Sequence, residues 1–240
     1  MPETKLAPWD KILPNQSFNS NLFRGPHSFE QAVYDVILKS CAVKPPQQQF
    51  KLETSSLFTV EEMASSPVTL GFLQWLIRMA GMRRVLEIGG FIGVSTMYFA
   101  QALPAGGVVV SVEKFEQFAD IARRNFAANG LTDKIRLVCG DAGEVVPTLD
   151  PAEPFDLVFI DGNKERYAFY LRSVMPLVRA GGIVAVDDAF FHGDALNPQP
   201  STEKGQGVRA CLDLAESLSS WDRVLLPVCN GLMLLTKRGG

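Results

Sequence analysis

The stretch that most constrains the fold runs from Arg84 to Gly93 and reads RVLEIGGFIG. Its first half is a short apolar run with β-branched residues, which is typical of a buried parallel strand. The run passes directly into Gly89, Gly90 and Gly93, and a helix-like apolar pattern follows. A strand, a glycine turn and a helix in this order form a nucleotide-binding βα unit, in which missing Cβ atoms let a ligand approach the backbone.

The acidic residue inside this strand indicates which ligand the turn receives. Glu87 lies two residues before the first glycine. A carboxylate there would repel a pyrophosphate but would suit a ligand that carries positive charge or hydroxyls. This favours S-adenosylmethionine, whose reactive end carries an ammonium and a sulfonium, over NAD. An NAD-dependent oxidoreductase is the alternative, and it predicts a catalytic Tyr–Lys or His arrangement elsewhere.

Strands and helices alternate after the glycine turn, and a helix that opens at Pro67 precedes it. Strands separated by helices predict an α/β fold with a Rossmann-like, mostly parallel, doubly wound sheet. The last two strands are too close together for a crossover helix, so they should form an antiparallel hairpin, as in class I methyltransferases. The expected strands after the turn are residues 108–112, 135–139, 155–160, 183–186, 223–228 and 231–236, and the expected helices are 115–129, 166–178 and 208–218.

The first 55 residues differ in character from the rest. They contain six prolines, a run of three glutamines from Gln47, and one helix-like segment at residues 28–41. We expect residues 1–55 to form an N-terminal extension that acts as a lid or a dimer arm, with a loosely packed arm as the alternative. Thr59 and Glu62 then form a capping-box pattern for a short helix.

Charge, hydropathy and cysteine spacing exclude several classes of partner. The net charge of −3 comes from interspersed acidic and basic residues, which is not the pattern of a nucleic-acid-binding surface. No apolar run reaches the roughly 18 residues of a membrane span, and no secretory signal is visible. The four cysteines form no Cys-x-x-Cys pair, which favours free thiols in a reducing compartment. We therefore expect a cytoplasmic protein with a small-molecule partner.

Acidic residues follow the expected strands where each strand ends. In an open parallel sheet, ligands bind outside the carboxyl ends of the strands, so these side chains should share one rim. Glu113 ends the second strand and suits the hydroxyls of a ribose. Asp141 and Ala142 follow the third strand and suit an adenine, although Asp141 is also placed to cap a helix.

Three further carboxylates follow the next two strands: Asp161, Asp187 and Asp188. Converged carboxylates repel one another unless a cation lies among them, and oxygen ligands favour Mg²⁺, with Mn²⁺ or Ca²⁺ as further candidates. Adjacent strand residues face opposite ways, so Asp187 and Asp188 can share a ligand only if the strand has already ended. Separately solvated loop acids are the alternative. His192 could add a ligand or a substrate contact, although a lone loop histidine is more often incidental.

Lys164 lies three residues after Asp161, where a helix is expected to begin. A surface lysine there would interact slightly unfavourably with the helix dipole. A lysine near a metal-bound hydroxyl can instead serve as general base when burial and the nearby cation destabilise its ammonium. Met63, Tyr167, Phe190 and Phe191 are candidates to line the acceptor site, with core packing as the alternative for each.

These residues together resemble the cation-dependent O-methyltransferases of the caffeoyl-CoA and catechol type. The resemblance covers roughly residues 55–238 and implies an S-adenosylmethionine-dependent methyltransferase domain over residues 56–240. Its motifs are VLEIGGFIGVS at 85–95, GDA at 140–142, FIDGNK at 159–164, Gly181-Gly182 before VDD at 186–188, and LPVCNGL at 226–232.

The resemblance implies a set of site residues and a reaction. Methyl transfer would run from S-adenosylmethionine to a hydroxyl of a small, catechol-like or specialised-metabolite acceptor, in a homodimer. Lys164 would be the base, assisted by Asp161. The metal ligands would be Asp161, Asp187 and Asp188. The candidate cofactor-binding residues are Met63, Glu87, Gly89, Gly90, Ser95, Glu113, Asp141, Ala142 and Asp161.

The chain departs from the family pattern at two places. It carries Asp187-Asp188 where the family usually has Asp-Asn, and Phe190-Phe191-His192-Gly193 where the family has a Trp-Gly pair. A third carboxylate should bind a divalent cation at least as well. The altered aromatic loop widens the range of acceptors. A metal-independent methyltransferase and a non-catalytic binding protein on the same scaffold are further alternatives.

Overall fold

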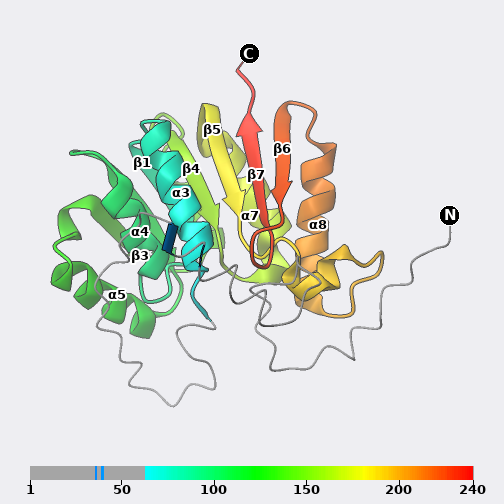
Figure 1. Cartoon of the computed structure of the whole chain (residues 1–240), viewed down its shortest axis with the longest axis horizontal. Coiled ribbons are helices and arrows are strands. Elements are labelled where there is room, and N and C mark those ends of the chain that lie inside the picture. The colour runs from blue at the N-terminus through cyan, green and yellow to red at the C-terminus, as the bar shows by residue number, and fades with distance from the viewer. Residues whose placement is uncertain (1–35, 37–38, 41–62, 240) are drawn as a thin grey trace.

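The computed structural model describes residue 36, residues 39–40 and residues 63–239. Within these residues one seven-stranded sheet has the order β3-β2-β1-β4-β5-β7-β6 (Figure 1). Strands β1 to β5 are parallel, whereas β7 runs antiparallel to both β5 and β6. The strands are β1 (Arg84–Ile88), β2 (Val108–Glu113), β3 (Ile135–Cys139), β4 (Phe155–Ile160), β5 (Val178–Val186), β6 (Trp221–Leu226) and β7 (Leu232–Lys237). The expected fold class and the closing antiparallel hairpin are confirmed.

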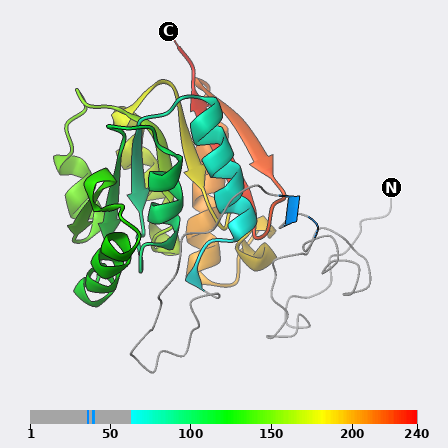
Figure 2. The same cartoon turned by 60° about the vertical axis from the view of Figure 1, so that its left-hand side comes forward.

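Helices cover both faces of the sheet (Figure 2). On one face the apolar side chains of α3 (Pro67–Met79), α4 (Val94–Ala102) and α5 (Glu116–Ala128) form one core cluster. On the other face α6 (Ala142–Val145), α7 (Tyr167–Val174) and α8 (Glu203–Ser217) form a second. Short 3-10 turns complete the connections: η3 (Thr132–Lys134), η4 (Val146–Thr148), η5 (Lys164–Arg166), η6 (Met175–Leu177) and η7 (Phe191–Leu196). None of the helices described here is long and apolar enough to cross a membrane.

Several element boundaries differ from the expectation, including β6, which runs from Trp221 to Leu226 rather than over residues 223–228. The α-helix expected to run to residue 178 ends at Val174 and continues as the 3-10 turn η6 to Leu177. β5 begins at Val178, five residues before the expected start. Gly181 and Gly182 therefore lie inside the strand rather than closing a helix. The register between β4 and β5 shifts there, and a Cβ at Gly182 would come within 3.1 Å of the carbonyl oxygen of Phe155. Glycine permits this irregular pairing, and the sequence pattern alone does not reveal it.

Helix α8 also begins earlier than expected. It starts at Glu203 rather than near residue 208, because the Thr202 hydroxyl accepts a hydrogen bond from the Gly205 amide and caps the first turn. At α3, by contrast, the expected start at Pro67 is confirmed, with the Ser66 hydroxyl as the cap.

Several expectations fall outside the described residues. These are the extension over residues 1–55 with its boundary to the domain, the capping box at Thr59 and Glu62, and the state of Cys41. Of the helix expected at residues 28–41, only Val36, Lys39 and Ser40 are described, and they are helical. The other three cysteines, Cys139, Cys211 and Cys229, are free thiols.

Candidate active site

The glycine turn after β1 packs directly against the turn after β4. Gly89 has φ +98°, and a Cβ there would overlap the carbonyl oxygen of Asp161 and come within 2.6 Å of its carbonyl carbon. The Asp161 amide donates to the carbonyl of Ile88 at 2.9 Å. A Cβ at Gly90 would lie 2.5 Å from the Ser111 hydroxyl oxygen. The absence of side chains at Gly89 and Gly90 therefore permits the close packing of this turn against Asp161 and Ser111.

Glu87 is a buried carboxylate beneath this turn. One oxygen, Oε2, accepts hydrogen bonds from the hydroxyls of Thr96 and Ser111, the second at 2.5 Å. The other, Oε1, has no partner among the described residues. Burial raises the pKa of Glu87 to about 7, and the hydroxyls of Ser111, Ser95 and Thr96 only partly oppose this. The expected cofactor-binding residues Glu87 and Ser95 thus lie together at the start of α4.

Replacing Glu87 by glutamine should change how stability depends on pH. Between about pH 4.5 and pH 7 the unfolded chain loses the Glu87 proton while the folded protein keeps it. The free energy of unfolding of the wild type should therefore fall by about 2–3 kcal/mol across this window because of Glu87. Glutamine keeps the acceptor oxygen for Thr96 and Ser111 but cannot titrate.

Urea unfolding of ligand-free protein at pH 5 and pH 7.5 tests this prediction. The difference in stability between Glu87→Gln and wild type should favour the variant more at pH 7.5 than at pH 5. Equal differences at both pH values would show that burial does not raise the pKa of Glu87.

Glu113 holds the glycine turn against the start of α5. Its two carboxylate oxygens accept the backbone amides of Phe91, at 2.7 Å, and Phe115, at 2.8 Å. Burial raises its pKa, against the effect of these hydrogen bonds. The side chain lies at the carboxyl end of β2, where a ribose-binding carboxylate is expected, and it also has a structural task that the sequence does not reveal.

Asp141 caps α6, which is the alternative that the sequence left open. Its Oδ1 accepts the Gly143 amide at 2.8 Å and pairs with Arg166 at 2.7 Å, and its Oδ2 pairs with Lys114 at 3.1 Å. The Gly143 hydrogen bond and the basic partners hold the pKa of Asp141 below its ordinary value. Ala142 follows it and is buried. These contacts account for the position of Asp141 without a bound ligand.

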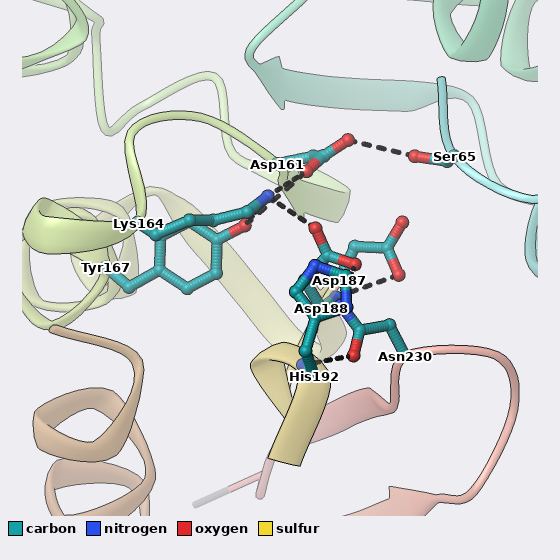
Figure 3. A network of polar contacts seen from close by, with 8 residues as sticks. All are labelled: Ser65, Asp161, Lys164, Tyr167, Asp187, Asp188, His192 and Asn230. Carbon is teal, nitrogen blue, oxygen red and sulfur yellow. Dashed lines mark hydrogen bonds and ion pairs between the residues drawn. The ribbon is translucent and has the colours of Figure 1, made fainter. Parts of the chain in front are cut away.

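Lys164 lies at the centre of the rim (Figure 3). Its Nζ is 2.6 Å from Asp161 Oδ1, 2.8 Å from Asp188 Oδ2 and 2.8 Å from the Tyr167 hydroxyl. An ammonium has three N–H donors, and these three acceptors match them. Burial alone would lower the pKa of Lys164, but Asp161, Tyr167 and Asp188 raise it well above its ordinary value.

Asp187 and Asp188 could share a ligand only if the strand ended before the second of them, and the structure meets this condition. β5 ends at Val186, and Asp188 has φ +54°, so the backbone has left the strand before the second carboxylate. Asp187 Oδ1 accepts the Asp188 amide at 3.0 Å. Burial, followed by the charges of Asp188 and Asp161, raises the pKa of Asp187 to about 8.

The three acids lie on one rim but do not surround a common point. Among residues 63–239 no three acidic, histidine or cysteine side chains converge as metal ligands. The ammonium of Lys164 instead lies between Asp161 and Asp188. No described cation pairs with Asp187. Three carboxyl groups thus face one ammonium, and their mutual repulsion contributes to the raised pKa of Asp187.

Three contacts of this site were not expected. The Ser65 hydroxyl donates to Asp161 Oδ2 at 2.9 Å, and the Asn230 amide donates to Asp188 Oδ1 at 2.9 Å. Tyr167, expected to line the acceptor site, is instead fully buried beneath Lys164. In the sequence, only the three-residue spacing between Lys164 and Tyr167 could have indicated that the two side chains are in contact. Ser65 and Asn230 come from distant parts of the chain. Asn230 lies in the LPVCNGL motif, but neither residue was expected to contact these acids.

The other candidates for the acceptor site are partly accounted for by local packing. The Phe190 ring packs on Gly231, where a Cβ would lie 2.7 Å from it. Phe191 packs against the His192 ring, with centroids 5.3 Å apart. Met63 is about half exposed at the start of the described domain.

A seven-stranded sheet of this order, with a glycine turn after β1 and acids on the adjoining strand ends, is the arrangement of a class I methyltransferase. Comparison with known proteins is more specific. The sequence profile of the O-methyltransferase family matches residues 40–238, so the chain belongs to that family. It is an enzyme, an O-methyltransferase that uses S-adenosylmethionine, and the NAD-dependent alternative does not hold.

Individual relatives agree with this placement. A catechol O-methyltransferase of Niastella koreensis is 32% identical over 146 residues, which is 60% of this chain and 66% of that protein. A catechol O-methyltransferase of Mycobacterium tuberculosis is 35% identical over 163 residues, covering 68% and 74%. The crystal structure of TomG from Streptomyces achromogenes, an O-methyltransferase involved in tomaymycin synthesis and bound to S-adenosylmethionine, has a TM-score of 0.69. It is 31% identical, and the match covers 74% of this chain and 83% of TomG.

Proposed function

We propose that this protein transfers a methyl group from S-adenosylmethionine to a hydroxyl of a small, catechol-like acceptor, and that a divalent cation takes part. One observation carries the proposal: the Lys164 ammonium is held between the carboxylates of Asp161 and Asp188, on the rim beside the glycine turn. Two similar proteins are named catechol O-methyltransferases, which supports a catechol-like acceptor. TomG is involved in tomaymycin synthesis, which supports an acceptor from specialised metabolism.

The cofactor would lie over the glycine turn. The unpartnered Oε1 of Glu87 would accept from a cationic group of the cofactor. Glu113, at the carboxyl end of β2, would accept from the ribose hydroxyls. Gly89, Gly90 and Ser95 would allow close approach, and Met63, Asp141, Ala142 and Asp161 would complete the surroundings. Binding the methyl donor and the acceptor on adjoining strand ends would align the hydroxyl oxygen with the methyl group.

Lys164 would take the proton of the attacking hydroxyl. It can do so only as a neutral amine, and its ion pairs with Asp161 and Asp188 hold it charged. The proposal therefore requires at least one of these pairs to be released in the complex with substrates. Tyr167 can remain hydrogen-bonded in both states because a phenol both donates and accepts.

The charges at the rim fit a divalent cation. When all three are ionised, Asp161, Asp187 and Asp188 carry two more negative charges than Lys164 neutralises. Carboxylate oxygens are suitable ligands for Mg²⁺ or Mn²⁺. When bound, such an ion would act as a Lewis acid that lowers the pKa of the acceptor hydroxyl. The position of Lys164 between Asp161 and Asp188 favours a second candidate, in which the ammonium itself serves as the cation and no metal is needed.

Metal removal distinguishes these candidates. Chelator-treated protein should lose methyl transfer to catechol by at least about 10²-fold, because a Lewis acid contributes several kcal/mol to the transition state. Mg²⁺ or Mn²⁺ should restore it. Asp187→Asn should need a higher metal concentration, whereas Asp222→Asn, which removes a surface acid paired with Arg238, should not.

The assay follows the labelled methyl group, and calorimetry follows cofactor binding. Activity that survives chelation unchanged would support the candidate in which Lys164 replaces the metal. Binding of S-adenosylmethionine without transfer to catechol at any metal concentration would contradict the proposed acceptor class. The homodimer remains a prediction from the family resemblance.

A further inference from the structure

Asp188 forms part of a chain of hydrogen bonds that extends beyond the groups used in the proposed reaction. Its Oδ2 accepts from Lys164, and its Oδ1 accepts from Asn230 Nδ2 at 2.9 Å. Asn230 Oδ1 in turn accepts the backbone amide of His192 at 2.6 Å (Figure 3). The four groups come from η5, the segment after β5, the turn between β6 and β7, and the start of η7.

The backbone fixes the positions of these groups. The turn between β6 and β7 is joined to the segment after β5 by two hydrogen bonds, from the Ala189 amide to the Gly231 carbonyl at 2.9 Å and from the Phe190 amide to the Asn230 carbonyl at 2.8 Å. The Phe190 ring packs against Gly231 and closes the same joint. These backbone contacts hold the main chain of Asn230 beside the segment that carries Asp188.

The hydrogen bonds have a fixed direction. The Lys164 ammonium and the His192 amide can only donate, and an ionised Asp188 can only accept. The residue between Asp188 and His192 must therefore donate on one side and accept on the other. Within this geometry the side-chain amide of Asn230 does both, and its orientation is dictated by its two partners.

We propose that Asn230 is a positioning residue that acts through Asp188 on Lys164, and that Asp188 and Asn230 form a matched carboxylate–amide pair. The inference rests on the proposed function for the roles of Lys164 and Asp188. Of the four combinations of carboxylate and amide at these positions, two satisfy every partner. One is Asp188 with Asn230, and the other reverses the central hydrogen bond by placing the amide at position 188 and the carboxylate at position 230.

Each single exchange breaks the chain. In Asn230→Asp, two carboxylates face each other where the Asp188–Asn230 distance is 2.9 Å, and their repulsion disfavours the charged site. In Asp188→Asn, two amide NH₂ groups face each other. Turning the Asn230 amide round only moves the conflict to the His192 N–H, so one donor stays unpaired in either orientation.

The double exchange restores the chain. The new amide at position 188 would offer its oxygen to Lys164 and its NH₂ to the new carboxylate at position 230. That carboxylate would accept the His192 amide with its second oxygen. All three hydrogen bonds are kept, with one reversed in direction. The Asn230→Asp exchange should therefore be harmful in the wild-type background and helpful in the Asp188→Asn background.

The experiment compares wild type, Asp188→Asn, Asn230→Asp and the double variant by methyl transfer to catechol at saturating Mg²⁺, with kcat and KM separated. We expect each single variant to lower kcat by about tenfold with little change in the KM of S-adenosylmethionine, and Asn230→Asp to raise kcat in the Asp188→Asn background. Independent effects that simply multiply in the double variant would overturn the inference. Asn129→Asp, which adds a carboxylate at the end of α5, is the matched control and should leave kcat unchanged.

Thermal unfolding of the same four proteins gives a second readout that needs no acceptor. The double variant should melt above at least one single variant, which independent destabilising changes cannot produce. If the wild type fails to methylate any catechol, the proposed function fails, and the melting cycle still decides whether the two residues are a matched pair. Melting temperatures that fall additively would overturn the pairing.

Discussion

Replacing Lys164 by methionine is expected to lower kcat for methyl transfer by about 10²- to 10⁴-fold, the usual contribution of a general base. Methionine keeps an unbranched apolar stem among Asp161, Asp188 and Tyr167 but can neither hold nor accept a proton. The affinity for S-adenosylmethionine should change little, because the turn over which the cofactor is expected to lie is built from Gly89 and Gly90 rather than from Lys164. Methyl-transfer kinetics and calorimetric titration with the cofactor measure the two quantities separately.

Two further variants make the Lys164 result interpretable. Lys164→Arg keeps the positive charge between the carboxylates but cannot act as a base, so it should be nearly as inactive as Lys164→Met. Lys204→Met removes an exposed lysine of α8 and should retain full activity. If Lys164→Arg keeps wild-type kcat, the side chain serves as a cation and not as the base.

Gly89→Ala should have the largest effect on the fold. The new Cβ would overlap the carbonyl oxygen of Asp161, which belongs to the backbone and cannot turn aside, and φ +98° is itself unfavourable for alanine. We expect a loss of at least about 3 kcal/mol in the free energy of unfolding, together with loss of S-adenosylmethionine binding. Urea unfolding and calorimetry provide the two measurements.

The chain offers a matched control for this steric effect. Gly81 also has a positive φ, +61°, but a Cβ there would meet nothing within 4 Å. Gly81→Ala should therefore cost only about 1 kcal/mol, from backbone strain alone, and should leave cofactor binding intact. Equal losses in the two variants would show that the close approach of Gly89 to Asp161 is not what holds the rim together.

Much of the fold could be predicted from local sequence. The apolar run before Gly89 and the alternation after it specify parallel strands, and the short connection between the last two strands requires a hairpin. The predicted starts of β5 and α8 were wrong, because each start depends on a contact that the hydrophobic periodicity of the sequence does not reveal. At β5 this is the irregular pairing with Phe155, and at α8 it is the Thr202 cap.

The candidate site could be predicted in part for the same reason. Asp161 with Lys164 and Asp187 with Asp188 follow the carboxyl ends of two parallel strands, so the strand order was enough to predict them on one rim. Ser65 and Asn230 reach the rim from segments 96 and 42 residues away from their partners. Only the folded arrangement reveals such contacts, and they determine which way the acids point.

The position of β7 has a consequence for how the protein is made. β7 lies between β5 and β6 although it follows both in the chain, so β6 lacks its observed partner until residues 232–237 have been synthesised. Asn230 and the joint at Gly231 immediately precede β7, and its pairing fixes them against the segment after β5. A nascent chain on the ribosome would therefore carry the glycine turn, Asp161 and Lys164 well before it could complete the rim, and the exposed edge of β5 would be open to other strands during that interval.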